Sequence, residues 1–136
     1  MVVDTSAIVA ILFQEPEAAE FEACLDTAHR RFMSAVTRVE LSFVVEGRKG
    51  DAGRHDLDLL LQAIDPDIVA VTAHHAGLAI DAFRRFGKGR HKAGLNIGDC
   101  FSYALAKASN QPLLFKGGDF IHTDVEAAFS RPPAHV

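Results

Sequence analysis

The chain has 136 residues, a mass of 14.7 kDa and a formal net charge of −4, with 49% hydrophobic and 24% charged residues. This balance supplies a hydrophobic core for one domain over residues 1–136 and argues against disorder. The acidic total argues against a general nucleic-acid coat protein, but it does not exclude an enzyme that acts on nucleic acid, because a metal site concentrates carboxylates.

The longest apolar stretch, residues 7–13, is too short for a membrane helix, and the first residues lack the basic region of a secretory signal. The two cysteines, Cys24 and Cys100, form no Cys-x-x-Cys pair, so neither a disulfide framework nor a zinc ribbon is indicated. We therefore expect a cytoplasmic protein with no membrane span. Cys100 falls on an apolar helix face, which favours a packing role over a nucleophilic one.

Short apolar strands alternate with helices along the chain. Strands are predicted at residues 2–3, 31–33, 68–71 and 112–115. Helices are predicted at residues 6–13, 16–28, 35–47, 54–64, 72–86 and 98–109. Because a crossover between parallel strands needs a helix-length connection, this order predicts an α/β fold with a short parallel sheet covered on both faces. The Pro-rich segment at residues 131–133 is predicted to be a terminal tail.

Two acidic residues follow predicted strands. Asp4 comes directly after the first strand, and Asp119 lies a few residues beyond the last one. In an open parallel sheet the functional crevice lies outside the carboxyl ends of the strands. Both carboxylates are therefore expected to face one crevice.

Two further acids stand on predicted helices. Glu40 shares a helical stripe with five small or apolar residues, namely Val36, Val39, Phe43, Val44 and Gly47. No Arg or Lys lies on this stripe, and a buried unpaired carboxylate is costly, so a functional role is favoured for Glu40. Asp99 lies in the first turn of the helix at residues 98–109, whose apolar side makes it a rigid platform.

Three of these acids also have a structural explanation. Asp4 before Thr5 and Ser6 is a suitable helix cap, Asp99 is favoured at the positive end of a helix dipole, and Asp119 suits a turn. If these carboxylates converge, they repel one another unless a cation offsets their negative charge. Magnesium, or manganese in its place, prefers such oxygen ligands and activates water for phosphodiester hydrolysis.

A basic segment precedes Asp99 in the sequence. It contains Arg84, Arg85, Lys88, Arg90, His91 and Lys92. These cations could hold the backbone of an RNA beside the metal site, or they could form a solvated helix end and loop. In the second case the RNA contact is expected near Arg30, Arg31, Arg48 and Lys49. Phe86 and Tyr103 could stack on bases, although a core position is favoured for both.

Four segments, in order along the whole chain, resemble the PIN-domain ribonucleases and specifically the VapC toxins of bacterial toxin–antitoxin pairs. They are Met1-Val2-Val3-Asp4-Thr5-Ser6-Ala7, Arg38-Val39-Glu40-Leu41, Leu95-Asn96-Ile97-Gly98-Asp99-Cys100-Phe101-Ser102-Tyr103-Ala104-Leu105-Ala106 and Leu113-Leu114-Phe115-Lys116-Gly117-Gly118-Asp119-Phe120. A single Asp-Thr-Ser is a weak signal, but four motifs at compatible spacing are a strong one.

The resemblance implies a three-layer α/β/α fold with a central parallel sheet and a magnesium-dependent endoribonuclease activity. It also implies inhibition by a small VapB-like antitoxin and formation of a homodimer. The acidic residues of the family map onto Asp4, Glu40, Asp99 and Asp119. Family members commonly carry a polar residue where this chain has Gly118, which puts a contact from that position in doubt. Asp124 is a possible additional acid of the site, or a turn or cap residue.

Two other functions stay open at this point. A phospho-acceptor or phosphatase domain of the receiver or haloacid-dehalogenase type also gathers acids at strand ends, but it usually has an acidic pair near the first strand, which Asp4-Thr5-Ser6 does not supply. A non-catalytic RNA-binding module on the same scaffold is the second alternative, and the retained quartet of acids argues against it.

Overall fold

The computed structural model describes residues 1–129, so the predicted tail at residues 131–133 lies outside the described residues. Within this part, four strands form one parallel sheet in the order β3-β2-β1-β4. They are β1 (Val2–Val3), β2 (Phe32–Ser34), β3 (Asp67–Val69) and β4 (Leu113–Leu114). The helices are α1 (Thr5–Leu12), α2 (Ala18–Thr27), α3 (Ala35–Ile64), α4 (Ala73–Phe86), α5 (Ile97–Ser109) and the 3-10 turn η1 (Phe120–His122).

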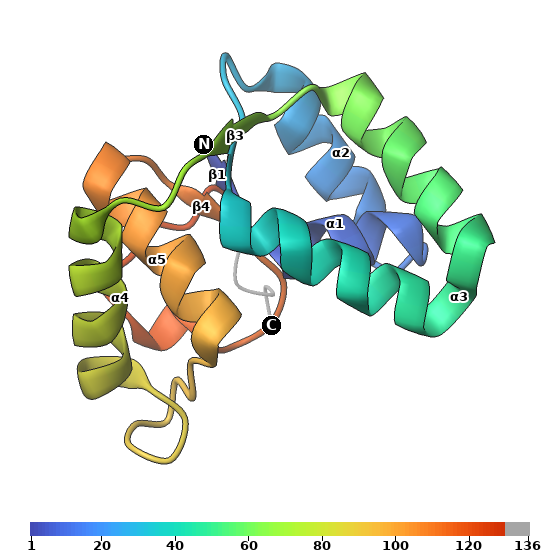
Figure 1. Cartoon of the computed structure of the whole chain (residues 1–136). Coiled ribbons are helices and arrows are strands. Elements are labelled where there is room, and N and C mark those ends of the chain that lie inside the picture. The colour runs from blue at the N-terminus through green and yellow to red at the C-terminus, as the bar shows by residue number, and fades with distance from the viewer. Residues whose placement is uncertain (130–136) are drawn as a thin grey trace, which may run out of the picture.

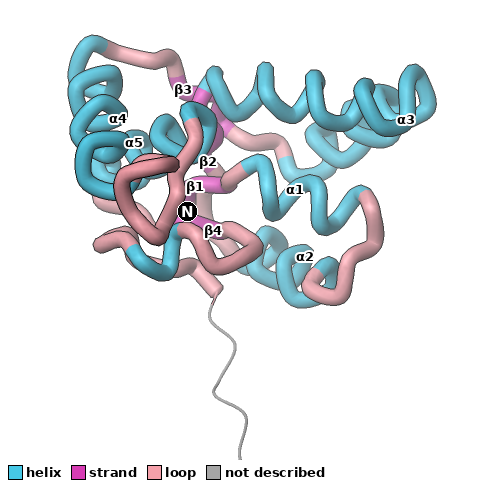
Figure 2. The backbone as a smooth tube through the Cα atoms, turned by 90° about the horizontal axis from the view of Figure 1, so that it is seen from below, coloured by secondary structure: helices cyan, strands magenta, loops and turns pink. Residues whose placement is uncertain are grey.

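Helices cover both faces of this sheet. Successive strand residues point to opposite faces, so Val2 and Leu113 pack with α4 and α5, whereas Val3 and Leu114 pack with α1, α2 and α3. Figure 1 shows α4 and α5 together on one side of the strands, and Figure 2 shows α1, α2 and α3 on the other. The three-layer α/β/α architecture expected from the sequence is confirmed.

Helix α3 differs most from the prediction. Two helices were expected at residues 35–47 and 54–64 with Gly47 as a stop, but the chain stays helical through Gly47 and turns at Gly50. Gly50 has φ 56° and ψ −141°, a left-handed conformation that glycine adopts without steric strain. The first half (residues 35–49) and the second half (residues 51–64) therefore fold back on each other, as Figure 1 shows.

Other boundaries shift by a few residues. Helix α2 begins at Ala18 instead of residue 16, β3 covers Asp67–Val69 instead of residues 68–71, and α5 begins at Ile97. Helix α5 starts earlier because Asn96 caps it, accepting a hydrogen bond from the backbone N–H of Asp99. Among the described residues, no helix is both long and apolar enough to cross a membrane.

Candidate active site

Three of the four predicted acids line one pocket of about 440 Å³, which we call the acid pocket. Asp4 follows the central strand β1, Glu40 stands in the first half of α3, and Asp99 lies in the first turn of α5. The basic side chains of Arg48 and Lys116 line the same pocket. Residues from distant parts of the sequence therefore meet at the carboxyl end of β1, where the crevice was expected.

Asp4 is 2% exposed and is held by three hydrogen bonds. Its Oδ2 accepts from the Ser6 backbone N–H (3.1 Å) and the Ser6 hydroxyl (2.6 Å), and its Oδ1 accepts from the Ser102 hydroxyl (2.6 Å). The bond to the Ser6 backbone caps α1, so the structural explanation of Asp4 is correct. The cap does not exclude a role in the pocket, because Asp4 also lines it.

The hydroxyls of Ser102 and Thr37 extend this network into the core. Both residues are 0% exposed, and their oxygens lie 3.2 Å apart. Because Ser102 has one hydroxyl proton, which it donates to Asp4, Thr37 donates to Ser102. The sequence analysis missed both residues. The sequence feature that could have identified them is a hydroxyl side chain at an apolar helix position. Thr37, for example, shares the buried face of α3 with Leu41 and Val45.

Glu40 lies in the pocket for a different reason from the one expected. Its helical stripe is not a core face as a whole, since Val39 is 52% and Phe43 76% exposed and Val44 is only partly buried against the core. Glu40 itself is half-buried, and its carboxylate accepts a short hydrogen bond from Thr5. A Cβ on Gly98 would clash with the Glu40 carboxylate, so the missing side chain at Gly98 lets the carboxylate approach α5.

Asp99 and Asn96 form a capping box at the start of α5. The Asp99 carboxylate accepts from the Asn96 backbone N–H at 3.0 Å, as the dipole explanation of Asp99 anticipates. The pKa of Asp99 is raised to about 7, mainly by burial; the hydrogen bond from Asn96 lowers it, and the nearby charges of Asp4, Asp119 and Glu40 add to the rise. Three like charges thus act on one carboxyl group, which favours a cation in this pocket.

The thiol of Cys100 is buried, as expected for a packing residue. Burial, and then the charge of Asp99, raises its pKa to about 11. The thiol therefore stays protonated near neutral pH, which disfavours a nucleophilic role.

The two acids near the C-terminal end differ in their surroundings. Asp119 is exposed beside η1 and does not line the acid pocket, although its charge reaches Asp99. Asp124 accepts a short hydrogen bond from Tyr103 and forms ion pairs with Lys107 (3.3 Å) and Arg85 (3.5 Å). This set of partners gives Asp124 a structural role in place of a position in the site.

The basic segment at residues 84–92 lies outside the acid pocket. Its five Arg and Lys side chains are exposed, and Arg85 is already paired with Asp81 and Asp124. Phe86 and Tyr103 are 9% and 2% exposed, so they are core residues that cannot stack on bases. An RNA contact by Arg84, Arg85, Lys88, Arg90 and Lys92 stays a prediction.

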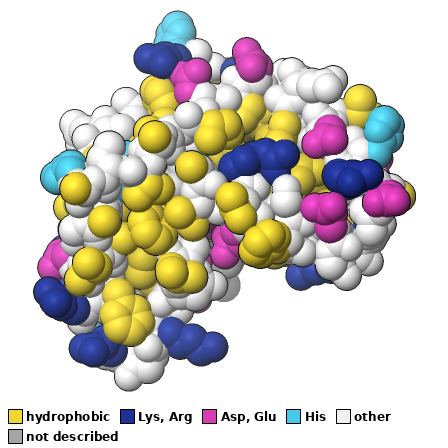
Figure 3. All heavy atoms as spheres, in the orientation of Figure 1, with side chains coloured by type: hydrophobic (Ala, Val, Ile, Leu, Met, Phe, Trp, Pro, Cys, Tyr) yellow, Lys and Arg dark blue, Asp and Glu magenta, His cyan; other side chains and the backbone are white. Residues whose placement is uncertain are grey.

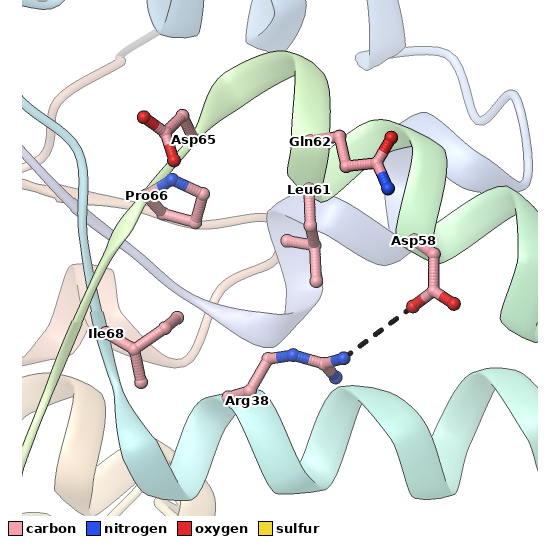
Figure 4. A pocket seen from close by; sticks show the side chains of 7 residues that line it. All are labelled: Arg38, Asp58, Leu61, Gln62, Asp65, Pro66 and Ile68. Carbon is pink, nitrogen blue, oxygen red and sulfur yellow. Dashed lines mark ion pairs between the residues drawn. The ribbon is translucent and has the colours of Figure 1, made fainter.

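A second pocket, shown in Figure 4, lies between the two halves of α3 and β3. Arg38 reaches from the first half toward Asp58 on the second half, with 3.8 Å between nitrogen and oxygen. Both side chains are partly exposed, so the ion pair contributes little free energy. Arg38 also donates to the Ser42 hydroxyl at 2.7 Å. We interpret this pocket as the groove along which the two halves of α3 pack against each other.

The acid pocket offers carboxylate oxygens as metal ligands. Among residues 1–129, no three His, Cys, Asp or Glu side chains converge closely enough to enclose a metal by themselves. Mg²⁺ usually binds through one or two carboxylates and keeps several waters, so it does not require such a cage. Asp4 and Asp99, which both line the pocket, supply ligands of the type that a hard divalent ion takes.

Comparison with known proteins identifies the family. The sequence model of the PIN domain matches residues 1–126. Ribonuclease VapC30 of Mycobacterium tuberculosis is 55% identical over 125 residues, which cover 92% of this chain and 95% of that protein. Ribonuclease VapC of Mycolicibacterium smegmatis is 54% identical over 127 residues, 93% of this chain and 98% of that protein.

A solved structure shares the fold at much lower identity. The Mycobacterium tuberculosis toxin VapC20, described as cleaving the Sarcin-Ricin loop, gives a TM-score of 0.72 at 15% identity over 91% of this chain and 95% of that chain. The fold and the sequence match therefore define a PIN domain, a class of nuclease that generally uses divalent metal ions. Within that class, the chain belongs to the VapC ribonucleases. The resemblance seen in the sequence is confirmed.

The raised pKa of Asp99 predicts how stability depends on pH. A carboxyl group with a raised pKa binds its proton more tightly in the folded state, so the free energy of unfolding falls as pH rises from about 4 to about 7. Asp99→Asn removes this group, and we expect the variant to be more stable than wild type by ~1–2 kcal/mol at pH 8. Urea denaturation without metal at pH 5, 6.5 and 8 measures the difference, which should shrink toward acid pH. A difference independent of pH would contradict this account.

The Thr37–Ser102–Asp4 network predicts a stability loss. Ser102→Ala leaves Asp4 Oδ1 and the Thr37 hydroxyl without their partner in a fully buried place, so we expect a loss of ~1–3 kcal/mol in the free energy of unfolding. Ser109→Ala in the same helix is the matched control, because Ser109 bonds only its own helix backbone at Leu105. Equal effects of the two changes in urea denaturation would show that the network contributes nothing.

Proposed function

We propose that this chain is a magnesium-dependent endoribonuclease that hydrolyses RNA phosphodiester bonds at the acid pocket, with Mn²⁺ able to replace Mg²⁺. The observation that carries the proposal is the meeting of Asp4, Glu40 and Asp99 from three separate elements in one pocket. Their mutual repulsion disfavours the metal-free charged state, and a divalent cation relieves it. The naming of its relatives as ribonucleases supports RNA as the substrate.

Each acid has a distinct part in this proposal. Asp4 and Asp99 hold the metal, because Asp4 is fixed by Ser6 and Ser102 and Asp99 by the capping box. Glu40, anchored by Thr5, faces the same space and positions water or a second ligand. Asp119 contributes its charge from the exposed edge. When bound, the metal lowers the pKa of water and stabilises charge on the phosphate.

The biological role follows from the same relatives. We propose that the chain, acting as one nuclease unit over residues 1–136, is the toxin of a toxin–antitoxin pair and is held inactive by a small VapB-like antitoxin. A structural relative, VapBC2 from Rickettsia felis, is described as bound to a DNA fragment from its promoter; it gives a TM-score of 0.71 at 15% identity over 93% of this chain and 94% of that chain. That likeness concerns the fold alone. The antitoxin of this chain has to be tested separately, by co-purification with the product of a neighbouring reading frame.

An exposed apolar face supports the proposed homodimer. Phe43 on α3 and Ile97 at the start of α5 are 76% and 75% exposed, and Ile80 and Phe83 on α4 are 53% and 40% exposed. Figure 3 shows hydrophobic side chains gathered over α4 and α5 and across to the first half of α3. Large contiguous apolar patches of this kind mark protein interfaces. We propose that a second copy of the chain covers this face.

The catalytic proposal predicts the loss of cleavage in acid-pocket variants. Asp4→Asn and Glu40→Gln keep the shape of each side chain but remove its charge, so we expect at least ~100-fold slower Mg²⁺-dependent cleavage of an RNA panel. Asp51→Asn is the matched control, since the Asp51 side chain is 92% exposed on α3, and it should cleave like wild type. Every reaction is repeated with EDTA in place of Mg²⁺.

Two outcomes would contradict the nuclease proposal. Cleavage at the wild-type rate by both acid-pocket variants would place the chemistry elsewhere. Formation of an acyl-phosphate on Asp4 with a small phosphodonor, without RNA cleavage, would instead identify a phospho-acceptor domain. RNA binding by wild type with no cleavage in Mg²⁺ or Mn²⁺ would identify a non-catalytic binding module.

The dimer proposal predicts an effect of charge on the apolar face. Phe43→Asp places a charge on this face, and we expect the dimer to dissociate at least ~30-fold more readily, because an aromatic residue buried in an interface can contribute ~2 kcal/mol or more. Light scattering after size-exclusion chromatography over a concentration series measures this. Leu59→Asp is the matched control, because Leu59 is 52% exposed on the second half of α3. Equal effects of the two changes would argue against this face.

A further inference from the structure

We propose that Arg48, held against the ring of Phe13, binds a phosphate of the RNA backbone at the mouth of the acid pocket. This inference rests on the proposed function, because it takes RNA as the substrate. It assigns the electrostatic contact with RNA to the end of the first half of α3, and not to the basic segment at residues 84–92.

The acid pocket needs a cation that is free to meet phosphate. The carboxylates of Asp4, Glu40 and Asp99 repel a polyanion, so binding there depends on positive charge placed beside them. Among the described residues, two basic side chains line the pocket, Arg48 and Lys116. Which of them can bind RNA depends on the charges that each already contacts.

Lys116 is already neutralised. Its ammonium forms a short ion pair with Glu15 and lies 3.2 Å from a carboxylate oxygen of Glu17. The hydrogen bond that Lys116 donates to the Glu15 carboxylate is the largest cause of the raised pKa of Lys116. Its backbone N–H also donates to the Ser6 hydroxyl at 3.0 Å, the same hydroxyl that holds Asp4. Lys116 therefore serves the pocket as a structural residue.

Arg48 has no such partner. In the described part of the chain, it forms no ion pair with a carboxylate, and its guanidinium lies 5.1 Å from the centre of the Phe13 ring. A cation above an aromatic face is held in place without losing its charge. A planar guanidinium also matches a phosphate with two parallel hydrogen bonds, which an ammonium cannot form. Arg48 is thus positioned and still able to bind an anion.

The location of Arg48 separates it from the predicted basic segment. Phe13 ends α1, and α1 packs against α3, so Arg48 stands on the side of the pocket formed by these two helices. Figure 1 shows the loop at residues 87–94 at the far end of α4, away from α3. Phosphates near the carboxylates therefore meet Arg48 first.

Lys49 provides a matched control within the same structure. Its ammonium lies 5.2 Å from the centre of the same Phe13 ring, but Lys49 does not line the acid pocket. Replacement of either residue by alanine removes one positive charge and one cation–π contact with the Phe13 ring. Only Arg48→Ala removes a charge from the pocket wall. A difference between the two variants therefore reports position and not total charge.

The test measures binding of a labelled single-stranded oligoribonucleotide by fluorescence anisotropy at several NaCl concentrations, in EDTA and in an Asp99→Asn background. We expect Arg48→Ala to weaken binding about 10-fold at low salt and to reduce the log–log salt slope by ~0.7, the value for one phosphate contact with a single strand. Arg48→Lys should keep the slope, and Lys49→Ala should keep both the slope and the affinity. Circular dichroism and melting temperature confirm that each variant is folded.

Several results would overturn the inference. An unchanged slope and affinity in Arg48→Ala would do so, as would equal effects of Arg48→Ala and Lys49→Ala. A loss of binding in Arg90→Ala but not in Arg48→Ala would return the contact to the basic segment.

The inference and the proposed function fail separately. If Asp4→Asn cleaves RNA like wild type while Arg48→Ala weakens binding, the phosphate contact stands and the catalytic proposal fails. If Asp4→Asn is inactive while Arg48→Ala binds and cleaves RNA like wild type, the inference about Arg48 fails alone. In the catalytically competent protein, a phosphate contact predicts a raised KM for Arg48→Ala with kcat changed much less.

Discussion

The buried carboxylate of Asp4 is the interaction on which the rest of this site depends. A charged group that is 2% exposed is stable only if its oxygens are hydrogen-bonded, and here Ser6 and Ser102 supply the donors. Those two residues belong to α1 and α5, which lie on opposite faces of the sheet. Satisfying one buried charge therefore fixes both helix layers relative to the end of β1.

The same constraint shapes the opposite wall of the pocket. Thr37 on α3 completes the chain of hydroxyls behind Ser102, one turn before Glu40. Glu40 can reach the pocket because Gly98, at the start of α5, has no side chain in its way. The acids are thus placed by helices that pack against one another, and loop conformation contributes little. A site built in this way is rigid before any ligand binds.

The distribution of charge has a similar logic. Burial, and with it the charges of the neighbouring carboxylates, raises the pKa of Asp99, so the electrostatic energy of the pocket falls when a cation enters. The basic residues Lys116, Arg85 and Arg48 have two different roles. Lys116 and Arg85 are committed to carboxylate partners that stabilise the fold, whereas Arg48 rests on an aromatic ring and keeps its charge available. An acidic protein can in this way present positive charge where a polyanion approaches.

The fold class and the candidate acids could be predicted from the amino-acid sequence alone. Alternation of short apolar strands with helices requires parallel connections, and Asp4 must follow β1 whatever the packing, because these are properties of local pattern and chain order. Capping by Asp4 could also be predicted, since a cap bonds only neighbouring residues.

How these residues meet depends on the packing of the folded chain. The reason predicted for Glu40 was wrong, because helical periodicity identifies stripes but not which stripe faces the sheet, and Val39 and Phe43 lie at the surface. Ser102 was not singled out for the site, because its contact to Asp4 joins residues far apart in the chain. The turn at Gly50 in place of Gly47 likewise depends on packing between the two halves of α3, which no local propensity specifies.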